Sequence, residues 1–397
     1  MNICSKNAIS MTEQGTLGHI YPHIDQEKCI DCGLCAKTCP VNAPIELNSP
    51  IKAFAAISKD KADLMSSSSG AASSIMANHI LSRGGTVYGC VQENYRDIAH
   101  RRIDKIEDAH KIKNSKYVQS NIGLIYRAVK KDLTDGKEVL FTGTPCQIVG
   151  LRKYLRKDFP NLYLLDLVCH GVPSQKLLRE DVERTLSKHA ITADDIKILF
   201  RRKVGGKARL GMEYGLFPID KEGKELPMPR EDAAFLYNCY ITSFISGVIF
   251  RENCFKCQYA QPKRCGDITI ADFWGIKNTS IPTGNGISLL LANTDKGLSL
   301  VESIKAACYI EERTVTEAIH GNGQLMEASK EPKERKRFIA EYIIDSEKAY
   351  TKHIKEYRKA YRRKQQRIKL YLAITSCKPI HKVLRKLKHI IKKRYDT

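Results

Sequence analysis

The stretch Cys29-Ile-Asp-Cys32-Gly-Leu-Cys35-Ala-Lys-Thr-Cys39-Pro40 decides the fold of the N-terminal part of the chain. Its C-x2-C-x2-C-x3-C-P spacing is the run with which bacterial ferredoxins hold cubane 4Fe-4S clusters. Gaps of two residues turn three thiolates toward three corners of one cube, and Gly33 is free to adopt the positive φ of such a turn. Zinc sites usually pair two separated C-x2-C units instead. The run therefore predicts a protein that handles electrons one at a time.

The residues before this run resemble the end of a first ferredoxin motif. Residues 4–11 match the part that carries a fourth cysteine, and residues 18–25 match the hairpin strand between two motifs. In two-cluster ferredoxins the fourth cysteine of a motif ligates the other cluster. Cys4 would therefore join Cys29, Cys32 and Cys35 around one cluster, and Cys39 would have lost its own. We expect either a start further upstream or a one-cluster relic, with an unligated terminal thiol as the alternative for Cys4.

Composition indicates a reducing compartment. The chain has 397 residues, of which 42% are hydrophobic, enough for two or three domains with their own cores. Its 14 cysteines gather at metal-ligand spacings rather than forming a disulfide framework. The first residues lack the pattern of a secretory signal, and no apolar run approaches the ~20 residues of a membrane span. We therefore expect a cytoplasmic protein, because iron–sulfur clusters persist there and disulfides do not.

The net charge of +22 is concentrated at the C-terminal end. Residues 351–397 contain 17 Lys and Arg against only Glu356 and Asp396. Apolar residues recur there at helical spacing, opposite a basic face: Ile380, Val383, Leu384, Leu387, Ile390 and Ile391. Such a helix suits peripheral binding to an anionic membrane surface on the cytoplasmic side, and the alternative is a surface helix that covers its own domain. Nucleic acid is not expected as a partner, because the tail has too few aromatic side chains for a stacking platform.

Two segments predict strand–loop–helix units that present cysteines. Residues 139–141 are apolar and are followed by Gly-Thr-Pro-Cys146 and then by a helical pattern. Residues 162–167 form a second apolar strand that leads to Cys169. Loops at the carboxyl ends of such strands hold ligands in open α/β sheets. We expect both cysteines at one edge of a sheet; two buried structural thiols are the alternative.

A further metal-ligand pattern, Cys254-x2-Cys257 with Cys265 close by, follows in the second half of the chain. Beside a ferredoxin run it favours an iron–sulfur cluster over zinc, because neither a His nor a second C-x2-C lies near it. Earlier, residues 66–70 read Ser-Ser-Ser-Ser-Gly and lead into an Ala-rich helical pattern. The N-terminus of a helix suits phosphate, and an ordinary helix cap is the alternative.

Taken together, these motifs resemble the beta subunit of coenzyme F(420) hydrogenase/dehydrogenase, in its long bacterial form with a fused ferredoxin. The likeness spans about residues 3–300 and rests on five segments, which are residues 67–70, 141–147, 169–173, 254–257 and 266–275. It implies a mixed α+β and α/β fold. A truncated ferredoxin-type domain would occupy residues 1–50, the flavin- and cluster-binding unit residues 51–135 and 136–345, and a basic amphipathic helical tail residues 346–397.

The resemblance also implies an iron–sulfur flavoprotein with FAD beside an inner 4Fe-4S cluster. By motif, the inner cluster would be held by Cys146, Cys169, Cys254 and Cys257, with Cys265 as a spare or in place of Cys169. Flavin contacts would come from Ser67 and Gly70 at the phosphate and from Thr142 and Thr144 at the ring or ribityl chain. His170 would be a proton donor beside the flavin, since imidazole titrates near neutral pH; a local hydrogen-bonding role is the alternative.

The function that the resemblance implies is an oxidoreductase that moves electrons between 4Fe-4S clusters and a flavin. A two-electron organic substrate or carrier and a ferredoxin-like electron donor or acceptor protein would be its partners. One alternative is an electron-transfer subunit without its own substrate that serves a membrane-associated enzyme. A second is a protein with structural or sensory clusters whose tail binds nucleic acid.

Overall fold

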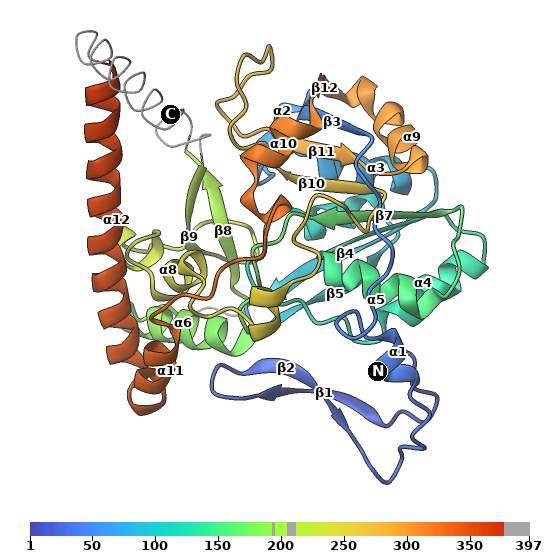
Figure 1. Cartoon of the computed structure of the whole chain (residues 1–397), viewed down its shortest axis with the longest axis horizontal. Coiled ribbons are helices and arrows are strands. Elements are labelled where there is room, and N and C mark those ends of the chain that lie inside the picture. Colours follow the sequence, from blue (N-terminus) through green and yellow to red (C-terminus); the bar gives the residue numbers. More distant parts are fainter. Residues whose placement is uncertain (193–194, 205–211, 377–397) are drawn as a thin grey trace, which may run out of the picture.

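A computed structural model describes residues 1–192, 195–204 and 212–376. Figure 1 shows an N-terminal hairpin and short helix below a large mixed sheet flanked by helices, with a helical C-terminal part along one side. The mixed α/β class expected from the sequence is confirmed.

The N-terminal segment is a hairpin followed by a cysteine-rich turn. Strands β1 (Ile9–Gln14) and β2 (His19–Ile24) pair antiparallel, as the likeness of residues 18–25 to a ferredoxin strand predicted. The helix α1 (Leu34–Thr38) begins after Gly33, whose φ of 68° is the left-handed conformation expected of that glycine. The hairpin is anchored to the main body, because Lys176 Nζ donates a 3.0 Å hydrogen bond to the carbonyl of Thr16.

The main sheet has eight strands in the order β12-β3-β11-β10-β7-β6-β4-β5. The strands are β3 (Lys52–Ser58), β4 (Thr86–Asn94), β5 (Asp97–Ile103), β6 (Val139–Gly143), β7 (Leu162–Leu167), β10 (Ile268–Asp272), β11 (Ser288–Ala292) and β12 (Cys308–Arg313). Neighbours among β10, β7, β6 and β4 run parallel, and the outer pairs run antiparallel. The carboxyl ends of four central strands therefore meet at one edge, where ligands bind in such sheets.

Helices cover both faces of this sheet, which explains why its strands read as apolar runs rather than as alternating patterns. One face packs against α3 (Ala72–Ser82) and α9 (Asp295–Ser303). The other face packs against α2 (Lys61–Met65), α4 (Ile125–Thr134), α5 (Pro145–Leu155) and α10 (Val315–Gly321). Burial on both sides fixes the strand ends rigidly, so the loops at the carboxyl edge stand on a firm base.

A second group of elements packs beside the sheet around its own apolar cluster, which includes Leu177, Tyr240, Phe244 and Phe338. Its helices and strands are α6 (Gln175–Lys188), β8 (Lys197–Lys203), β9 (Met212–Ile219), α7 (Arg230–Ala233), α8 (Cys239–Ser246), α11 (Arg335–Ile344) and α12 (Ser346–Ser376). Short 3-10 turns complete the fold at Ile106–Ile112, Glu252–Lys256, Lys305–Ala307 and Gly323–Leu325.

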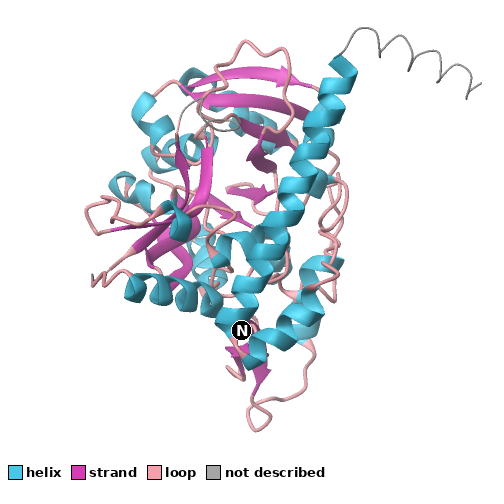
Figure 2. Cartoon of the chain, turned by 90° about the vertical axis from the view of Figure 1, so that its left-hand side faces the viewer, coloured by secondary structure: helices cyan, strands magenta, loops and turns pink. Residues whose placement is uncertain are grey.

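Helix α12 begins as part of this second group rather than as a free tail (Figure 2). Tyr350, His353 and Ile354 are buried, and the ring of Phe235 contacts Tyr357. This stretch is a surface helix that covers its own domain, which was the alternative to a membrane-binding helix. The apolar stripe of residues 380–391 lies outside the described residues. In the part of the chain that the structure describes, no helix has the length and apolar character to cross a membrane.

Candidate iron–sulfur sites

The loops after β6 and β7 leave the sheet side by side, because these parallel strands pair Gly143 with Asp166. Thr144 caps α5: its N–H donates to Gln147 Oε1 at 3.0 Å, and Pro145 occupies the first helical position, where no N–H is needed. The cap places Cys146 in the first turn of α5, exposed, with its Sγ 3.3 Å from Thr144 Oγ1. The predicted strand–loop–helix unit is confirmed, and its cysteine lies at the carboxyl edge.

Cys169 follows β7 by two residues and stands in a tightly constrained loop. Gly171 has a φ of 137°, and a Cβ there would lie 2.5 Å from the ring of Phe250, so only glycine fits. The Arg251 N–H donates to the carbonyl of Val172 at 3.0 Å, and the Cys254 N–H donates to the carbonyl of Arg251 at 2.9 Å. The turn of Cys254 is thereby tied to the loop of Cys169.

Cys146, Cys169 and Cys254 lie in neighbouring loops, and the thiols there influence one another's pKa. Burial raises the pKa of Cys169, and the charges of Cys254, Cys146 and Cys257 raise it further. Burial also raises the pKa of Cys254 to about 11, with added effects of Cys146 and Cys257. Half-buried thiols of raised pKa need a cation to become thiolates, and iron supplies that charge. These residues fit a metal cluster.

Among residues 1–192, 195–204 and 212–376, no three Cys, His, Asp or Glu side chains converge closely enough to hold one ion. In a cubane each thiolate binds a different iron atom at its own corner, so the ligands stand further apart than those around one ion.

Cys265 has hydrogen-bond partners of its own within the protein. Cys265 is 2% exposed. Its thiol has two hydrogen-bond acceptors within reach, Asp166 Oδ2 at 3.3 Å and the Pro145 carbonyl oxygen at 3.5 Å. Burial and then the carboxylate of Asp166 raise its pKa well above the usual value. This environment favours a neutral structural thiol and favours Cys169 as the fourth inner ligand. The inner ligand set itself stays a prediction.

A buried ion pair that the sequence analysis missed holds the ligand loop in place. Arg264 Nη2 lies 2.7 Å from Asp166 Oδ1, and their side chains are 1% and 0% exposed. The guanidinium also donates to the carbonyls of Tyr259 and Leu167, each at 3.1 Å. A signal was present, since Asp166 is the one charged residue inside the apolar strand β7.

The ferredoxin cysteines lie on a surface turn. Cys29, Cys35 and Cys39 are half-buried and Cys32 is exposed. Asp31 and Gly33 take positive φ values of 50° and 68°, which curl the backbone around the three cysteines of the C-x2-C-x2-C run. Cys39 ends α1 with extended backbone, so it leaves this turn as the motif predicted.

The N-terminal residues hold Cys4 close to this turn. Arg127 Nε donates to the carbonyl of Asn2 at 2.9 Å and its Nη2 to the carbonyl of Cys4 at 3.1 Å. Burial lowers the pKa of the Met1 amino group, and the nearby thiols of Cys4 and Cys35 act in the opposite direction. An Ala8 N–H donates to Cys4 Sγ at 3.4 Å and lowers the thiol pKa. Cys4 also lines one hollow together with Leu34, the neighbour of Cys35, so Cys4 lies close to the turn.

Three side chains fasten the ferredoxin segment to the inner-site loop. Arg251 Nη1 donates to the carbonyl of Ile20 at 2.9 Å, and the guanidinium lies 4.0 Å from the ring centroid of Tyr21. On the other side Gln258 Nε2 donates to the carbonyl of Pro40 at 2.7 Å, and the Tyr259 hydroxyl donates to the same oxygen. The two candidate cluster sites are thus held in a fixed relation.

Around the Ser-rich loop, the structure offers a setting for an anion. Ser67 Oγ is buried and has no hydrogen-bond partner among the described residues. Lys203 Nζ donates to the carbonyl of Ser69 at 2.9 Å, and burial lowers the Lys203 pKa to about 8. Arg201, bound to Asp272 at 2.8 Å, leaves its own buried Nε without a partner among those residues. An unpaired hydroxyl, a half-buried lysine and a buried arginine are groups that fit the phosphate of a nucleotide-type cofactor.

The other predicted flavin contacts have local roles. A Cβ on Gly70 would meet the Ala56 carbonyl oxygen at 2.2 Å, so this glycine lets the loop lie on β3. The Thr142 carbonyl accepts from His100 Nε2 at 2.9 Å, and Thr144 is the cap described above. Both threonines stand at the carboxyl edge, and a flavin contact stays a prediction for each.

His170 lies beside Cys169 in the loop after β7. Its carbonyl oxygen accepts a hydrogen bond from Ser329 Oγ at 2.6 Å. The residue is exposed at the surface, and protein atoms lie around its ring. These surroundings lower the imidazole pKa, and the nearby carboxylate of Asp272 opposes the effect. A proton-donor role stays a prediction.

Comparisons with known proteins relate both cysteine-bearing parts of the chain to described families. Residues 136–318 match the family that comprises the C-terminal part of the coenzyme F(420) hydrogenase/dehydrogenase beta subunit, and residues 22–45 match a 4Fe-4S binding domain. A search of curated proteins found no match. A similar solved structure is a chain of the F(420)-reducing [NiFe] hydrogenase complex from Methanosarcina barkeri, with 16% identity and a TM-score of 0.45 over 72% of this chain and 97% of that chain.

The family matches confirm the resemblance and the ferredoxin-type 4Fe-4S assignment. They cover the loops of Cys146, Cys169 and Cys254 in one unit and the run of Cys29 to Cys39 in the other. Residues 136–318 are thus similar to the C-terminal part of the coenzyme F(420) hydrogenase/dehydrogenase beta subunit, and a match to a 4Fe-4S binding domain precedes that unit.

Proposed function

We propose that this chain is an electron-transfer oxidoreductase with two 4Fe-4S clusters and a flavin, FAD by family likeness. The proposal is supported by two observations: Cys146 and Cys169 follow the paired strands β6 and β7, and the turn of Cys254 is hydrogen-bonded through Arg251 to the loop of Cys169. The ferredoxin segment is fastened to that same loop through Arg251.

The chain would hold the outer cluster through Cys4, Cys29, Cys32 and Cys35, and the inner cluster through the four edge cysteines. Clusters supply one-electron exchange, and a bound flavin would supply exchange of both single electrons and electron pairs. The protein would contribute placement, because Arg251, Gln258 and Tyr259 fix the distance between the two thiol groups.

For the flavin, the chain would supply an anion site and a binding edge. Ser67 Oγ, together with Lys203 and Arg201, would face a cofactor phosphate. The carboxyl edge near Thr142 and Thr144 would place the ring close to Cys146. An organic two-electron substrate or carrier would then approach the open side, where His170 is the nearest predicted proton donor.

Anaerobic purification with iron, sulfide and flavin quantification tests the proposal. We expect about eight irons, about eight sulfides and about one flavin per chain, at four irons for each cubane. Cys29→Ala and Cys254→Ala should each remove about half of the iron, from different clusters. Protein with neither acid-labile sulfide nor flavin would refute the proposal.

A second candidate function is an electron-transfer subunit that has no substrate of its own. The surface position of the ferredoxin turn, where Cys32 is exposed, favours contact with another protein. Reduction of a small-molecule acceptor by the purified chain alone would exclude it. If both the electron donor and the electron acceptor must be proteins, the subunit without its own substrate is favoured over the first candidate.

A further inference from the structure

A group of cations without carboxylate partners lies beside the ferredoxin turn. Two adjoining hollows of about 500 and about 490 Å³ separate that turn from the ends of α4 and α5. Their lining includes five basic side chains that we call the cationic face, namely Lys37, Lys130, Lys153, Arg156 and Lys157. Asp158 is the single carboxylate among the described lining residues.

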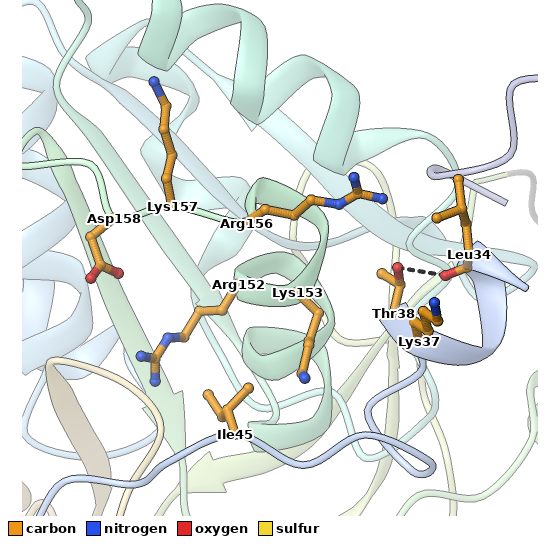
Figure 3. Close-up of a pocket in the computed structure, with 9 residues that line it drawn as sticks. All are labelled: Leu34, Lys37, Thr38, Ile45, Arg152, Lys153, Arg156, Lys157 and Asp158. Atoms are coloured by element: carbon orange, nitrogen blue, oxygen red, sulfur yellow. Dashed lines mark hydrogen bonds between the residues drawn. The ribbon is translucent and has the colours of Figure 1, made fainter.

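The five side chains of the cationic face form no ion pairs within the described part of the chain. Within the described part of the chain, none of its five members lies within 4.0 Å of a carboxylate oxygen, whereas many surface cations elsewhere do. Figure 3 shows Lys153 on the side of α5 that faces Ile45, with the Arg156 side chain extending toward α1. Lys37, Lys130, Arg156 and Lys157 are exposed. Such a field attracts anions over distances near the Debye length.

The cationic face lies beside two of the thiols proposed for the outer cluster, Cys4 and Cys35. Cys4 lines one hollow, and Leu34, the neighbour of Cys35, lines both. Exposed apolar residues sit on the same turn: Ile30 is 61% exposed and Val41 is 51% exposed. Protein interfaces combine such apolar contacts with polar and charged groups.

We propose that this surface docks a small acidic electron-carrier protein at the outer cluster. The inference rests on the proposed function, because it needs a redox centre at Cys4, Cys29, Cys32 and Cys35. Electron exchange requires a carrier to come close to that centre, and the face around it is the one that a carrier meets. Its cations select an acidic carrier, and Ile30 and Val41 supply the apolar contact. A membrane surface or a nucleic acid would not exchange electrons with the cluster.

The test uses the full chain, purified without oxygen, and an acidic two-cluster bacterial ferredoxin as the probe. Association is followed by biolayer interferometry at about 20 mM and about 500 mM salt. We expect the association rate constant of the wild type to fall by about tenfold or more with salt. The association rate constant of the triple variant Lys37→Glu, Lys130→Glu, Lys157→Glu at low salt should be about tenfold or more below that of the wild type, and it should change little with salt.

Two matched variants separate charge from structure. The triple Arg variant at Lys37, Lys130 and Lys157 keeps the charge and should stay within about twofold of the wild type. Lys355→Glu with Lys359→Glu changes two exposed lysines on α12, on the other side of the molecule in Figure 1, and should leave the rate unchanged.

The outcomes distinguish this inference from the proposed function. Wild-type protein without iron and sulfide would refute the proposed function. Normal iron content with the same ferredoxin association in the wild type and the triple Glu variant would refute only the docking surface. The docking surface would also be refuted if the triple Glu variant lost binding to anionic vesicles or to an oligonucleotide but kept its association with ferredoxin.

Discussion

Arg264 and Asp166 form an ion pair of 2.7 Å in which both side chains are almost fully buried. The pair joins the ligand loop around Cys257 to the end of β7, next to the loop of Cys169. Asp166 Oδ2 also accepts from the Gly266 N–H at 2.8 Å, so both carboxylate oxygens are used. The geometry of the inner site therefore depends on a charge pair that contains no thiol.

Removing the guanidinium should be far more harmful than removing both charges. Arg264→Met leaves Asp166 buried without its partner, and we expect a loss of about 3–5 kcal/mol in unfolding free energy. The double variant Arg264→Met, Asp166→Asn should recover part of this loss, because no charge stays unpaired. Thermal unfolding and iron content check both, and a single variant within about 1 kcal/mol of wild type would contradict the role assigned to the pair.

The two candidate fourth ligands of the inner cluster should respond differently to substitution. Cys169→Ala should lower the iron content from about eight to about four per chain, because it removes one corner of a cubane. Cys265→Ala should retain about eight, since its thiol bonds Asp166 and the Pro145 carbonyl instead. Cys308→Ala, at a buried thiol in β12, is the matched control. The reverse pattern of iron loss would place Cys265 in the ligand set.

Arg251 should control how firmly the ferredoxin hairpin is held. Arg251→Ala removes a charged hydrogen bond to Ile20 and a cation–π contact with Tyr21, together about 2 kcal/mol. Hydrogen exchange of residues 19–24 should then accelerate by about tenfold or more. Arg179→Ala is the control, because its ion pair with Glu13 on the same hairpin is exposed and should contribute less than about 1 kcal/mol. Equal acceleration in both variants would contradict the clamp.

Acid should destabilise the protein through His100. Burial lowers the pKa of this imidazole to about 4, against the opposing effect of the Thr142 carbonyl. In the unfolded chain its pKa is about 6.5, so the unfolded state binds more protons between these values. The stability that comes from keeping His100 neutral is therefore complete above about pH 6.5 and is lost as the pH falls toward 4.

Between about pH 7.5 and about pH 5.5 this effect amounts to about 1 kcal/mol for one histidine. His100→Gln should reduce the acid-induced drop in the thermal midpoint, measured without oxygen. His23→Gln, at an exposed position of the hairpin, is the control. An unchanged drop in the His100 variant would show that this histidine does not carry the pH dependence.

Much of the local structure was predictable because its causes are short-range. The C-x2-C-x2-C run and the freedom of Gly33 dictate a tight turn. The apolar run before Gly143 and the cap at Thr144 dictate a strand, a loop and then a helix. Each of these patterns lies within about fifteen residues, so neighbouring side chains and backbone preferences suffice to set it.

The same reasoning left alternatives open where burial decides the outcome. From the sequence, Cys265 was either a spare thiol or a replacement for Cys169, and packing against Asp166 gives Cys265 a partner of its own. The helical tail from residue 346 was either a membrane-binding helix or a cover for its own domain, and Tyr350 and Ile354 are buried in the second group of elements. Local spacing carries no information on which distant surface will cover a side chain.

By itself, the sequence determined the ferredoxin-type 4Fe-4S assignment, because the cysteine spacing of residues 29–39 selects an iron–sulfur cluster over zinc and over disulfides. It also indicated the family resemblance and individual strand–loop–helix units. Tertiary structure alone decided which cysteine-bearing loops lie together and what joins them, through contacts such as Arg251 with Tyr21 and Arg264 with Asp166. Those pairs span large stretches of chain, and their strength comes from burial, which exists only once the sheet, the hairpin and the ligand loop have packed together.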